Sequence, residues 1–260
     1  MKTSLKLSVS AALLALSCVA SAKDWTTIRI GVDPTYAPFE SVAPDGRVVG
    51  FDVDLGNALC ARLKAKCVWV QSSFDGLIPG LQARKFDVIL SSMAATAKRR
   101  EQIDFTNRLY RNQTKLVARR DSGVKPEASS LQGKHIGVEQ GTVQETYGRE
   151  KWAPSGAQIV SYQNYDQAYD DLTTGRLDGV LMDAVQGKLG FLDTPRGKDY
   201  AFAGDTVYDA TIMGDGDAAG IRKGDSDLRD ALNTAFAGLL ADGSYKKIEA
   251  RYFDFDMYGK

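Results

Sequence analysis

Short strand-like runs alternate with helix-like segments along most of this 260-residue chain. Apolar and β-branched residues predict strands at residues 28–32, 68–70, 86–90, 135–138, 158–162 and 179–182. Apolar residues at helical spacing predict a helix that begins near Asp52 and helices at 77–83, 142–152 and 167–173. This alternation favours an α/β fold with mainly parallel sheets. The length suits two domains of about 100 residues each.

Residues 1–22 have the features of an export signal. Lys2 and Lys6 precede an apolar stretch, and the stretch ends in a small-x-small cleavage site at Ala20-Ser21-Ala22. We expect cleavage after Ala22. A buried core helix and a lipid anchor at Cys18 are the alternatives, but the residues before Cys18 make a poor lipobox. No second apolar stretch reaches the roughly 20 residues that a membrane span needs.

Cleavage leaves 31 basic and 33 acidic residues, so the mature chain has no basic excess for nucleic acid or anionic lipid. It also leaves Cys60 and Cys67, which an oxidising compartment favours as a disulfide. Closing so short a loop stabilises by roughly 2–3 kcal/mol in the chain-entropy model. Two cysteines and one histidine lack zinc-finger spacing, so we expect no metal and no cofactor.

Arg99 and Asp183 are candidates for a binding site. Arg99 lies in the segment SSMAATAKRR (91–100), and Asp183 closes the apolar run of LTTGRLDGVLMD (172–183). A guanidinium binds a carboxylate through parallel hydrogen bonds, and a buried carboxylate can hold an ammonium. Two such groups could grip a free amino acid by its backbone ends. A surface salt bridge and an ordinary strand-end aspartate are the alternative interpretation.

Further motifs extend this pattern: RIGVDPTYAPF (29–39), GFDVDLGNALC (50–60), GVEQGTVQE (137–145) and YFDFDMYGK (252–260). With them the chain resembles the extracellular solute-binding proteins, family 3, of polar amino-acid ABC importers. It is most similar to their lysine/arginine/ornithine- and histidine-binding branch. The resemblance covers nearly the whole mature chain. It implies a monomeric periplasmic protein that binds a free amino acid and docks on a membrane permease.

The resemblance also implies the type II periplasmic-binding-protein fold, with two lobes joined by two crossing segments. We expect a discontinuous lobe 1 at 23–110 and 214–260, lobe 2 at 114–207, and hinge segments at 111–113 and 208–213. Such boundaries carry an uncertainty of a few residues. Ligand is expected in the cleft, at the carboxyl ends of the strands.

By the same resemblance, the ligand's α-carboxylate would meet Arg99 and the N–H groups around Ala94. Its α-ammonium would pair with Asp183. Relatives often have Ser in place of Ala94, so one acceptor for the ammonium is missing here. The matching positions near these groups are the strand-end Ser91 and Ser92, for which capping is the alternative, and the helix start Thr142, Val143 and Gln144.

The ligand side chain would lie between the aromatic rings of Tyr36 and Phe74, with Asp33 facing its distal cation. Core packing of the rings and a turn role for Asp33 before Pro34 are the alternatives. Glu139 departs from the pattern, because close relatives usually have Leu there. A second carboxylate suits a guanidinium. A solvent-facing Glu at the cleft rim is the alternative.

These residues favour a binding protein for a basic amino acid, with arginine first and ornithine, lysine or histidine next. The absence of a hydroxyl at Ala94 also leaves room for an N-substituted arginine. An enzyme on the same scaffold, a dehydratase acting on a carboxylated ring, is the alternative class. Such a substrate has no α-ammonium for Asp183, and the sequence shows no nucleophile–base pair or phosphate loop. We therefore expect binding without catalysis.

Overall fold

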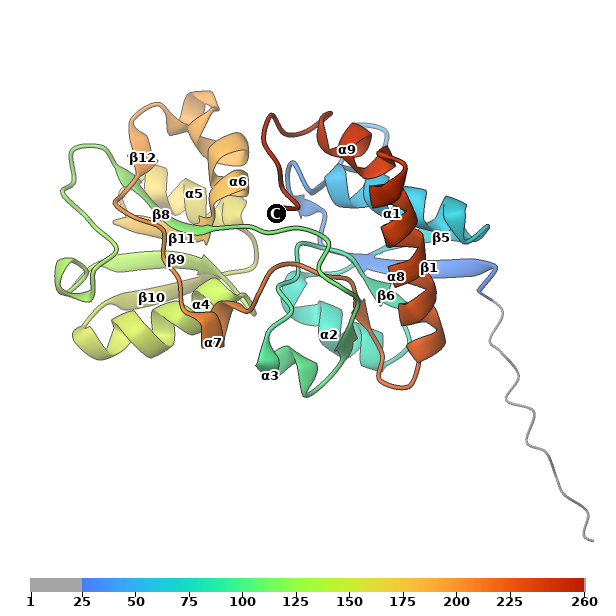
Figure 1. Ribbon diagram of the computed structural model, residues 1–260. Helices are drawn as coiled ribbons and strands as arrows, with labels where there is room; N and C mark the ends of the chain where they lie inside the picture. Colours follow the sequence, from blue (N-terminus) through green and yellow to red (C-terminus); the bar gives the residue numbers. More distant parts are fainter. Residues whose placement is uncertain (1–24, 260) are drawn as a thin grey trace, which may run out of the picture.

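The computed structural model describes residues 25–259, which form two lobes joined by two crossing stretches of chain (Figure 1). The predicted export signal and its cleavage site lie outside the described residues. We call the part around the first sheet lobe 1 and the part around the second sheet lobe 2. Each sheet has five strands, and each is flanked by helices.

The sheet of lobe 1 has the strand order β5-β1-β6-β13-β7. Its strands are β1 (Thr27–Val32), β5 (Lys66–Gln71), β6 (Val88–Ile89), β7 (Asp104–Phe105) and β13 (Gly220–Ile221). β1 pairs in parallel with β5 and β6, whereas β13 runs antiparallel to both β6 and β7. The antiparallel strand comes from the far end of the chain, so lobe 1 is discontinuous in sequence.

The sheet of lobe 2 has the order β10-β9-β11-β8-β12. Its strands are β8 (Thr114–Arg119), β9 (His135–Glu139), β10 (Gln158–Tyr162), β11 (Gly179–Asp183) and β12 (Tyr200–Phe202). β9 pairs in parallel with β10 and β11, and β8 runs antiparallel to β11 and β12. Both sheets are therefore mixed, with two parallel and two antiparallel pairings each, although four of the five strands in each run in the same direction. The predicted α/β class is confirmed.

The α-helices around lobe 1 are α1 (Phe51–Arg62), α2 (Leu77–Gln82), α3 (Ala97–Arg100), α8 (Ser226–Ala241) and α9 (Ser244–Glu249). Those around lobe 2 are α4 (Val143–Tyr147), α5 (Tyr165–Thr173) and α6 (Ala184–Gln186). α7 (Ala210–Met213) lies in the predicted crossing segment 208–213 and contacts both α4 and α3. Further helical segments, which are 3-10 or π helices, are η1 (Phe74–Gly76), η2 (Ala128–Ser130), η3 (Gly148–Trp152), η4 (Ala153–Ser155), η5 (Gly187–Leu192) and η6 (Pro195–Gly197). A small sheet holds β2 (Thr35–Tyr36), β3 (Glu40–Val42) and β4 (Val48–Val49).

Helix α5 illustrates how local sequence sets an element. The side chain of Asn164 accepts a hydrogen bond from the amide of Gln167, which caps the helix start. Tyr165, Ala168, Tyr169 and Leu172 then recur on one helix face, and all four are buried.

The predicted helix at 142–152 is regular only as far as Tyr147. The wider turn η3 follows, and then η4, which contains Pro154. Proline has no N–H and its ring crowds the carbonyl four residues earlier, so the α-helical pattern cannot continue through this position. The predicted strand at 86–90 is also shorter, because only Val88 and Ile89 pair with neighbours.

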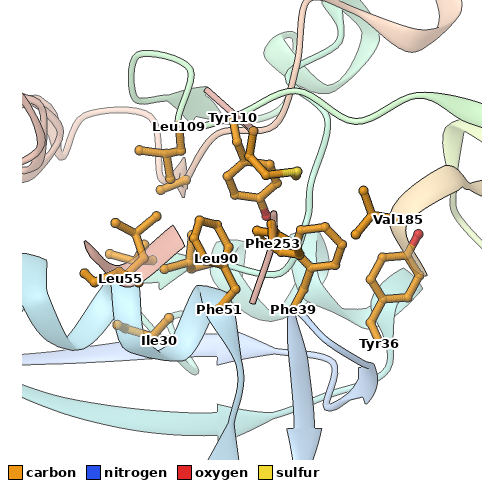
Figure 2. Packing of buried hydrophobic residues seen from close by; sticks show 14 of the residues in the cluster. Ile30, Tyr36, Phe39, Phe51, Leu55, Leu90, Leu109, Tyr110, Val185 and Phe253 are labelled. Atoms are coloured by element: carbon orange, nitrogen blue, oxygen red, sulfur yellow. The ribbon is translucent and has the colours of Figure 1, made fainter. Parts of the chain in front are cut away.

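One hydrophobic cluster includes buried residues from both lobes. Phe39 stacks on Tyr110 with ring centroids 5.5 Å apart, and Tyr36 lies 5.8 Å from Tyr165 of lobe 2. Figure 2 shows Tyr36 beside Val185, which also belongs to lobe 2. The lobes are thus in contact across the cleft.

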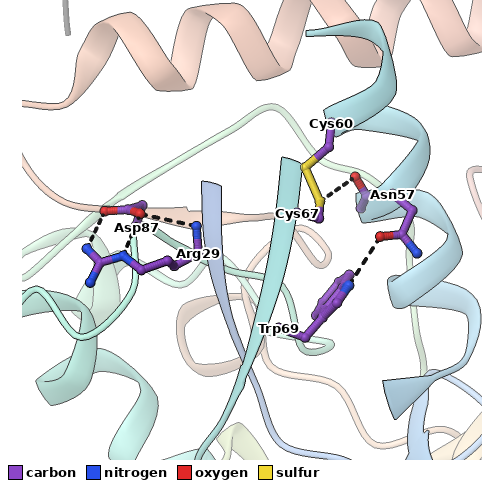
Figure 3. Close-up of a disulfide and its surroundings, with 7 residues drawn as sticks. Arg29, Asn57, Cys60, Cys67, Trp69 and Asp87 are labelled. Carbon is purple, nitrogen blue, oxygen red and sulfur yellow. Dashed lines mark hydrogen bonds and ion pairs between the residues drawn. A yellow bond between two sulfur atoms is a disulfide. The ribbon is translucent and has the colours of Figure 1, made fainter. Parts of the chain in front are cut away.

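The predicted disulfide is confirmed. Cys60, near the end of α1, is bonded to Cys67 in β5, with an S–S distance of 2.02 Å (Figure 3). The bond fixes α1 to β5, which is an edge strand of the sheet. Nearby, the indole of Trp69 donates to the side chain of Asn57 at 3.2 Å, which joins the same two elements.

Candidate ligand-binding site

A pocket with an empty volume of about 400 Å³ lies between the lobes. Every residue that the sequence proposed as a ligand contact lines it: Asp33, Tyr36, Phe74, Ser91, Ser92, Ala94, Arg99, Glu139, Thr142, Val143, Gln144 and Asp183. Two acidic residues that were not proposed, Glu40 and Asp217, complete the lining. The lining comes from both lobes, so the pocket depends on their contact.

Arg99 provides a positive charge in the pocket. Thr96 caps α3 by accepting a hydrogen bond from the Arg99 amide at 3.2 Å, which fixes the start of this short helix. The guanidinium donates to the carbonyl of Ala94 at 2.9 Å and to that of Gly141, in lobe 2, at 3.0 Å. It also lies 5.3 Å from the ring centroid of Phe74. Burial lowers the pKa of Arg99 to about 10, so the side chain is a cation at neutral pH.

Asp183 provides a negative charge from the opposite lobe. One carboxylate oxygen accepts a hydrogen bond from the hydroxyl of Tyr36 at 2.8 Å, and the other accepts one from the amide of Gln144 at 2.7 Å. Burial raises the pKa of Asp183 to about 6, although these two bonds and the charge of Arg99 oppose the shift. Gln144 is itself held by a bond to the hydroxyl of Thr114 at 3.1 Å.

Asp33 and Glu139 form an acidic part of the pocket, one from each lobe. Their exposed fractions are 4% and 2%. Asp33 accepts bonds from the amide and hydroxyl of Thr35, and burial still raises its pKa. Burial raises the pKa of Glu139 well above its usual range, and the negative charge of Asp33 adds to this. Glu139 therefore lies inside the pocket and not at its solvent-facing rim.

The hydroxyl groups among the predicted contacts are largely engaged within the protein. Ser91 accepts from the amide of Asp33 at 2.9 Å and donates to Glu40 at 2.8 Å. The hydroxyl of Ser92 lies 3.0 Å from that of Tyr110. Thr142 caps α4 and donates to the carbonyl of Glu139 at 2.6 Å. These hydrogen bonds hold the walls of the pocket in place.

Glu40 and Asp217 were missed for different reasons. Glu40 directly follows the segment 29–39, which holds Asp33 and Tyr36, and this closeness in sequence could have indicated it. Burial and the charge of Asp52 raise the pKa of Glu40 well above its usual range. Asp217 lies on the return crossing, where it forms an isolated bridge with Ala94. No local pattern marks it, because only folding brings it to the pocket.

A pocket between two α/β lobes, with opposite charges fixed on different lobes, is typical of proteins that close around a small ligand. The model of the bacterial extracellular solute-binding proteins, family 3, matches residues 28–255. The chain belongs to this family. The resemblance drawn from the sequence is thereby confirmed, and the fold is that of the type II periplasmic binding proteins.

Known relatives of this solute-binding protein bind basic amino acids. The histidine-binding periplasmic protein of Escherichia coli K12 is 49% identical over 256 residues, which are 98% of this chain and 96% of the relative. The lysine/arginine/ornithine-binding periplasmic protein of the same organism is 49% identical over 233 residues, 90% of each chain. A Salmonella typhimurium periplasmic binding protein, solved to explain its high arginine specificity, has a TM-score of 0.80 at 32% identity, covering 87% of this chain and 99% of that one.

Two negative findings concern the described part of this solute-binding protein. Across residues 25–259, no helix is both long and apolar enough to cross a membrane. Within the same range, no group of three or more His, Cys, Asp or Glu side chains could hold a metal ion.

Proposed function

We propose that this solute-binding protein captures a basic amino acid, with arginine preferred over ornithine, lysine and histidine, for an ABC importer. The observation that carries the proposal is the position of Asp33 and Glu139. Both carboxyl groups are buried in the pocket, and they come from opposite lobes. Buried acids without a cation are costly, so a ligand that brings a cation to them is favoured.

The other charged groups fit the ends of a free amino acid. Arg99 has N–H groups in addition to those that bind Ala94 and Gly141, and these suit the α-carboxylate. Asp183 suits the α-ammonium, because its carboxylate is fixed by Tyr36 and Gln144 in a water-poor site. Tyr36 and Phe74 line the same pocket, and we propose that their aromatic rings pack against the ligand's side chain.

Arginine is the first choice because a guanidinium carries a planar fork of donors. Two carboxylates can accept from different edges of that fork, whereas a lysine or ornithine ammonium is a compact point charge. The buried acids also disfavour acidic and apolar side chains, which would leave charge unpaired.

Binding would act by closing the cleft. The bonds from Arg99 to Gly141 and from Tyr36 to Asp183 join the lobes in the closed form. A ligand held by both lobes binds the closed form better than the open form and shifts the equilibrium toward it. We propose that the crossing segments 111–113 and 208–213 are the hinge. The closed monomer, exported to the periplasm after cleavage at Ala22, would then dock on its permease.

A second candidate ligand is an N-substituted arginine. A neighbouring cavity on the hinge side shares Ala94, Val143, Asp183 and Asp217 with the ligand pocket. A substituent on the α-nitrogen could extend toward it past the small side chain of Ala94. A dehydratase reaction is less well supported, because a carboxylated ring would bring no cation to Asp33, Glu139 or Asp183.

A thermal-shift panel followed by calorimetry tests the proposal. The protein is unfolded, dialysed and refolded to remove any ligand carried from the cell. Arginine, ornithine, lysine, histidine and an N-substituted arginine are compared with glutamate, leucine and glycine. Ligand binding to the native state raises stability by RT ln(1 + [L]/Kd), so the true ligand gives the largest shift. A larger response to glutamate, leucine or glycine would contradict the proposal.

A further inference from the structure

Asp217 is a pocket residue with a buried carboxyl oxygen that accepts no hydrogen bond within residues 25–259. Its backbone is well anchored, since its amide donates to the carbonyl of Tyr110 at 3.0 Å and its carbonyl accepts from Leu109 at 2.8 Å. Its exposed fraction is 4%, and the oxygen without a partner in this range is Oδ2. Asp217 lines the same pocket as Asp183 and Arg99.

The neighbouring charges indicate which kind of hydrogen-bond donor suits Asp217. Arg99 attracts Asp217, but its guanidinium bonds go to the carbonyls of Ala94 and Gly141. Asp183 and Asp52 repel it, and together with burial they raise the pKa of Asp217 well above its usual range. A buried carboxylate with no donor is destabilising, and most such groups in proteins have a partner. A hydrogen-bond donor with positive charge would satisfy this carboxyl group and favour its ionised form.

We infer that Asp217 is a ligand-binding residue that holds the α-ammonium of the ligand together with Asp183. This inference rests on the proposed function and extends it. Both oxygens of Asp183 already accept one bond each, from Tyr36 and Gln144. An ammonium has several N–H donors to satisfy, and Asp217 offers an acceptor that no protein group uses.

With this assignment, the α-ammonium and the side-chain cation of a basic amino acid would each lie between two acids, one from each lobe. Asp217 is bridged to Ala94 of lobe 1, and Asp183 ends a strand of lobe 2. Asp33 and Glu139 likewise come from lobes 1 and 2. The two acids of each pair repel each other, and a cation between them removes that repulsion. The ligand's two cations would thus favour closure at both places.

The test uses Asp217→Asn, which keeps the shape and removes the charge, and Asp199→Asn as a matched control. Asp199 is exposed and lines neither the ligand pocket nor the neighbouring cavity. Binding of arginine is compared with binding of δ-guanidinovalerate, which is arginine without its α-amino group. We expect Asp217→Asn to weaken arginine about 10- to 100-fold and to leave δ-guanidinovalerate nearly unchanged. The control should bind both ligands as the unchanged protein does.

The melting temperature of the ligand-free protein separates a binding role from a structural one. Above pH 7, Asp217→Asn should melt at the same temperature as the unchanged protein or at a higher one, because the substitution removes an unpaired buried charge. If the unchanged protein binds arginine and Asp217→Asn binds it equally well, the inference is wrong and the proposed function stands. Equal weakening of both ligands together with a lower melting temperature would also overturn it. If the unchanged protein binds no basic amino acid, the proposed function and this inference both fail.

Discussion

The hydroxyl of Tyr36 in lobe 1 donates a 2.8 Å hydrogen bond to the carboxylate of Asp183 at the end of β11 in lobe 2. The two residues are both proposed to contact the ligand, and they also hold the lobes together. Ligand binding and closure therefore depend on the same atoms. The carbonyl of Gly141 in lobe 2 forms a second contact between the lobes, since it accepts a hydrogen bond from Arg99.

The first prediction concerns this bond. Tyr36→Phe keeps the aromatic ring and removes the cross-lobe donor. A hydrogen bond to a charged group contributes about 1.5–3 kcal/mol, so arginine should bind roughly tenfold or more weakly by calorimetry. Tyr162→Phe is the matched control, because Tyr162 donates to Asp171 at 2.8 Å within lobe 2 and away from the pocket. Similar losses in both variants would show that the cross-lobe bond has no special role.

The second prediction concerns the two anchors. Arg99→Ala and Asp183→Ala each leave an opposite charge of the bound ligand unpaired in a buried site. Removing one partner of a buried charge pair costs about 3–5 kcal/mol, so affinity should fall at least about a hundredfold. Arg100→Ala, at the exposed neighbouring position, should bind normally. Near-normal calorimetric affinity in both anchor variants would remove these residues from the site.

The third prediction concerns ligand preference. Glu139→Leu takes away one of the two carboxylates near the ligand's side chain. Arginine should lose more affinity than histidine or ornithine, because a guanidinium loses a forked partner while a smaller cation keeps Asp33. The preference for arginine should fall by about tenfold or more. If the three affinities change by one common factor, selectivity resides elsewhere in the pocket.

The fourth prediction concerns pH. Burial raises the pKa of Asp183 to about 6, above that of an unfolded chain. In the ligand-free protein this carboxyl therefore contributes stability at low pH that is lost as pH rises through about 6. A bound ammonium favours the ionised form, so binding should release protons and arginine affinity should rise from pH 5 to pH 8. Calorimetry at pH 6 in two buffers of different ionisation enthalpy measures the release, and equal affinities at pH 5 and pH 8 would contradict it.

Much of the fold was predictable because its signals are local. The strand at Gln158–Tyr162 has the predicted bounds, and β1, β9 and β11 are each one residue longer than predicted. β5 is longer by two residues at its start and by one at its end. Strand β8, the small sheet of β2–β4 and the long helix α8 were not assigned from the pattern. The antiparallel position of β13 is a long-range property, since it depends on the chain returning to lobe 1 after lobe 2 is complete.

The sequence by itself determined what short-range chemistry can specify. Alternating apolar periods gave the α/β class, and the Cys60–Cys67 spacing in an exported chain gave the disulfide. The motifs that carry the resemblance to family 3 predicted Asp33, Arg99 and Asp183 as site residues, and all three line the pocket. Each of these depends on neighbours within a few positions, where the backbone period fixes which side chains share a face.

Only the tertiary structure decided which distant groups meet. It placed Glu139 inside the pocket with Asp33 and not at the rim, and it added Glu40 and Asp217 to the lining. The chain crosses between the lobes twice, so residues far apart in sequence end on the same surface. Whether a carboxylate is solvated or buried beside another carboxylate depends on that long-range packing. The same packing therefore decides which ligand charge the pocket favours.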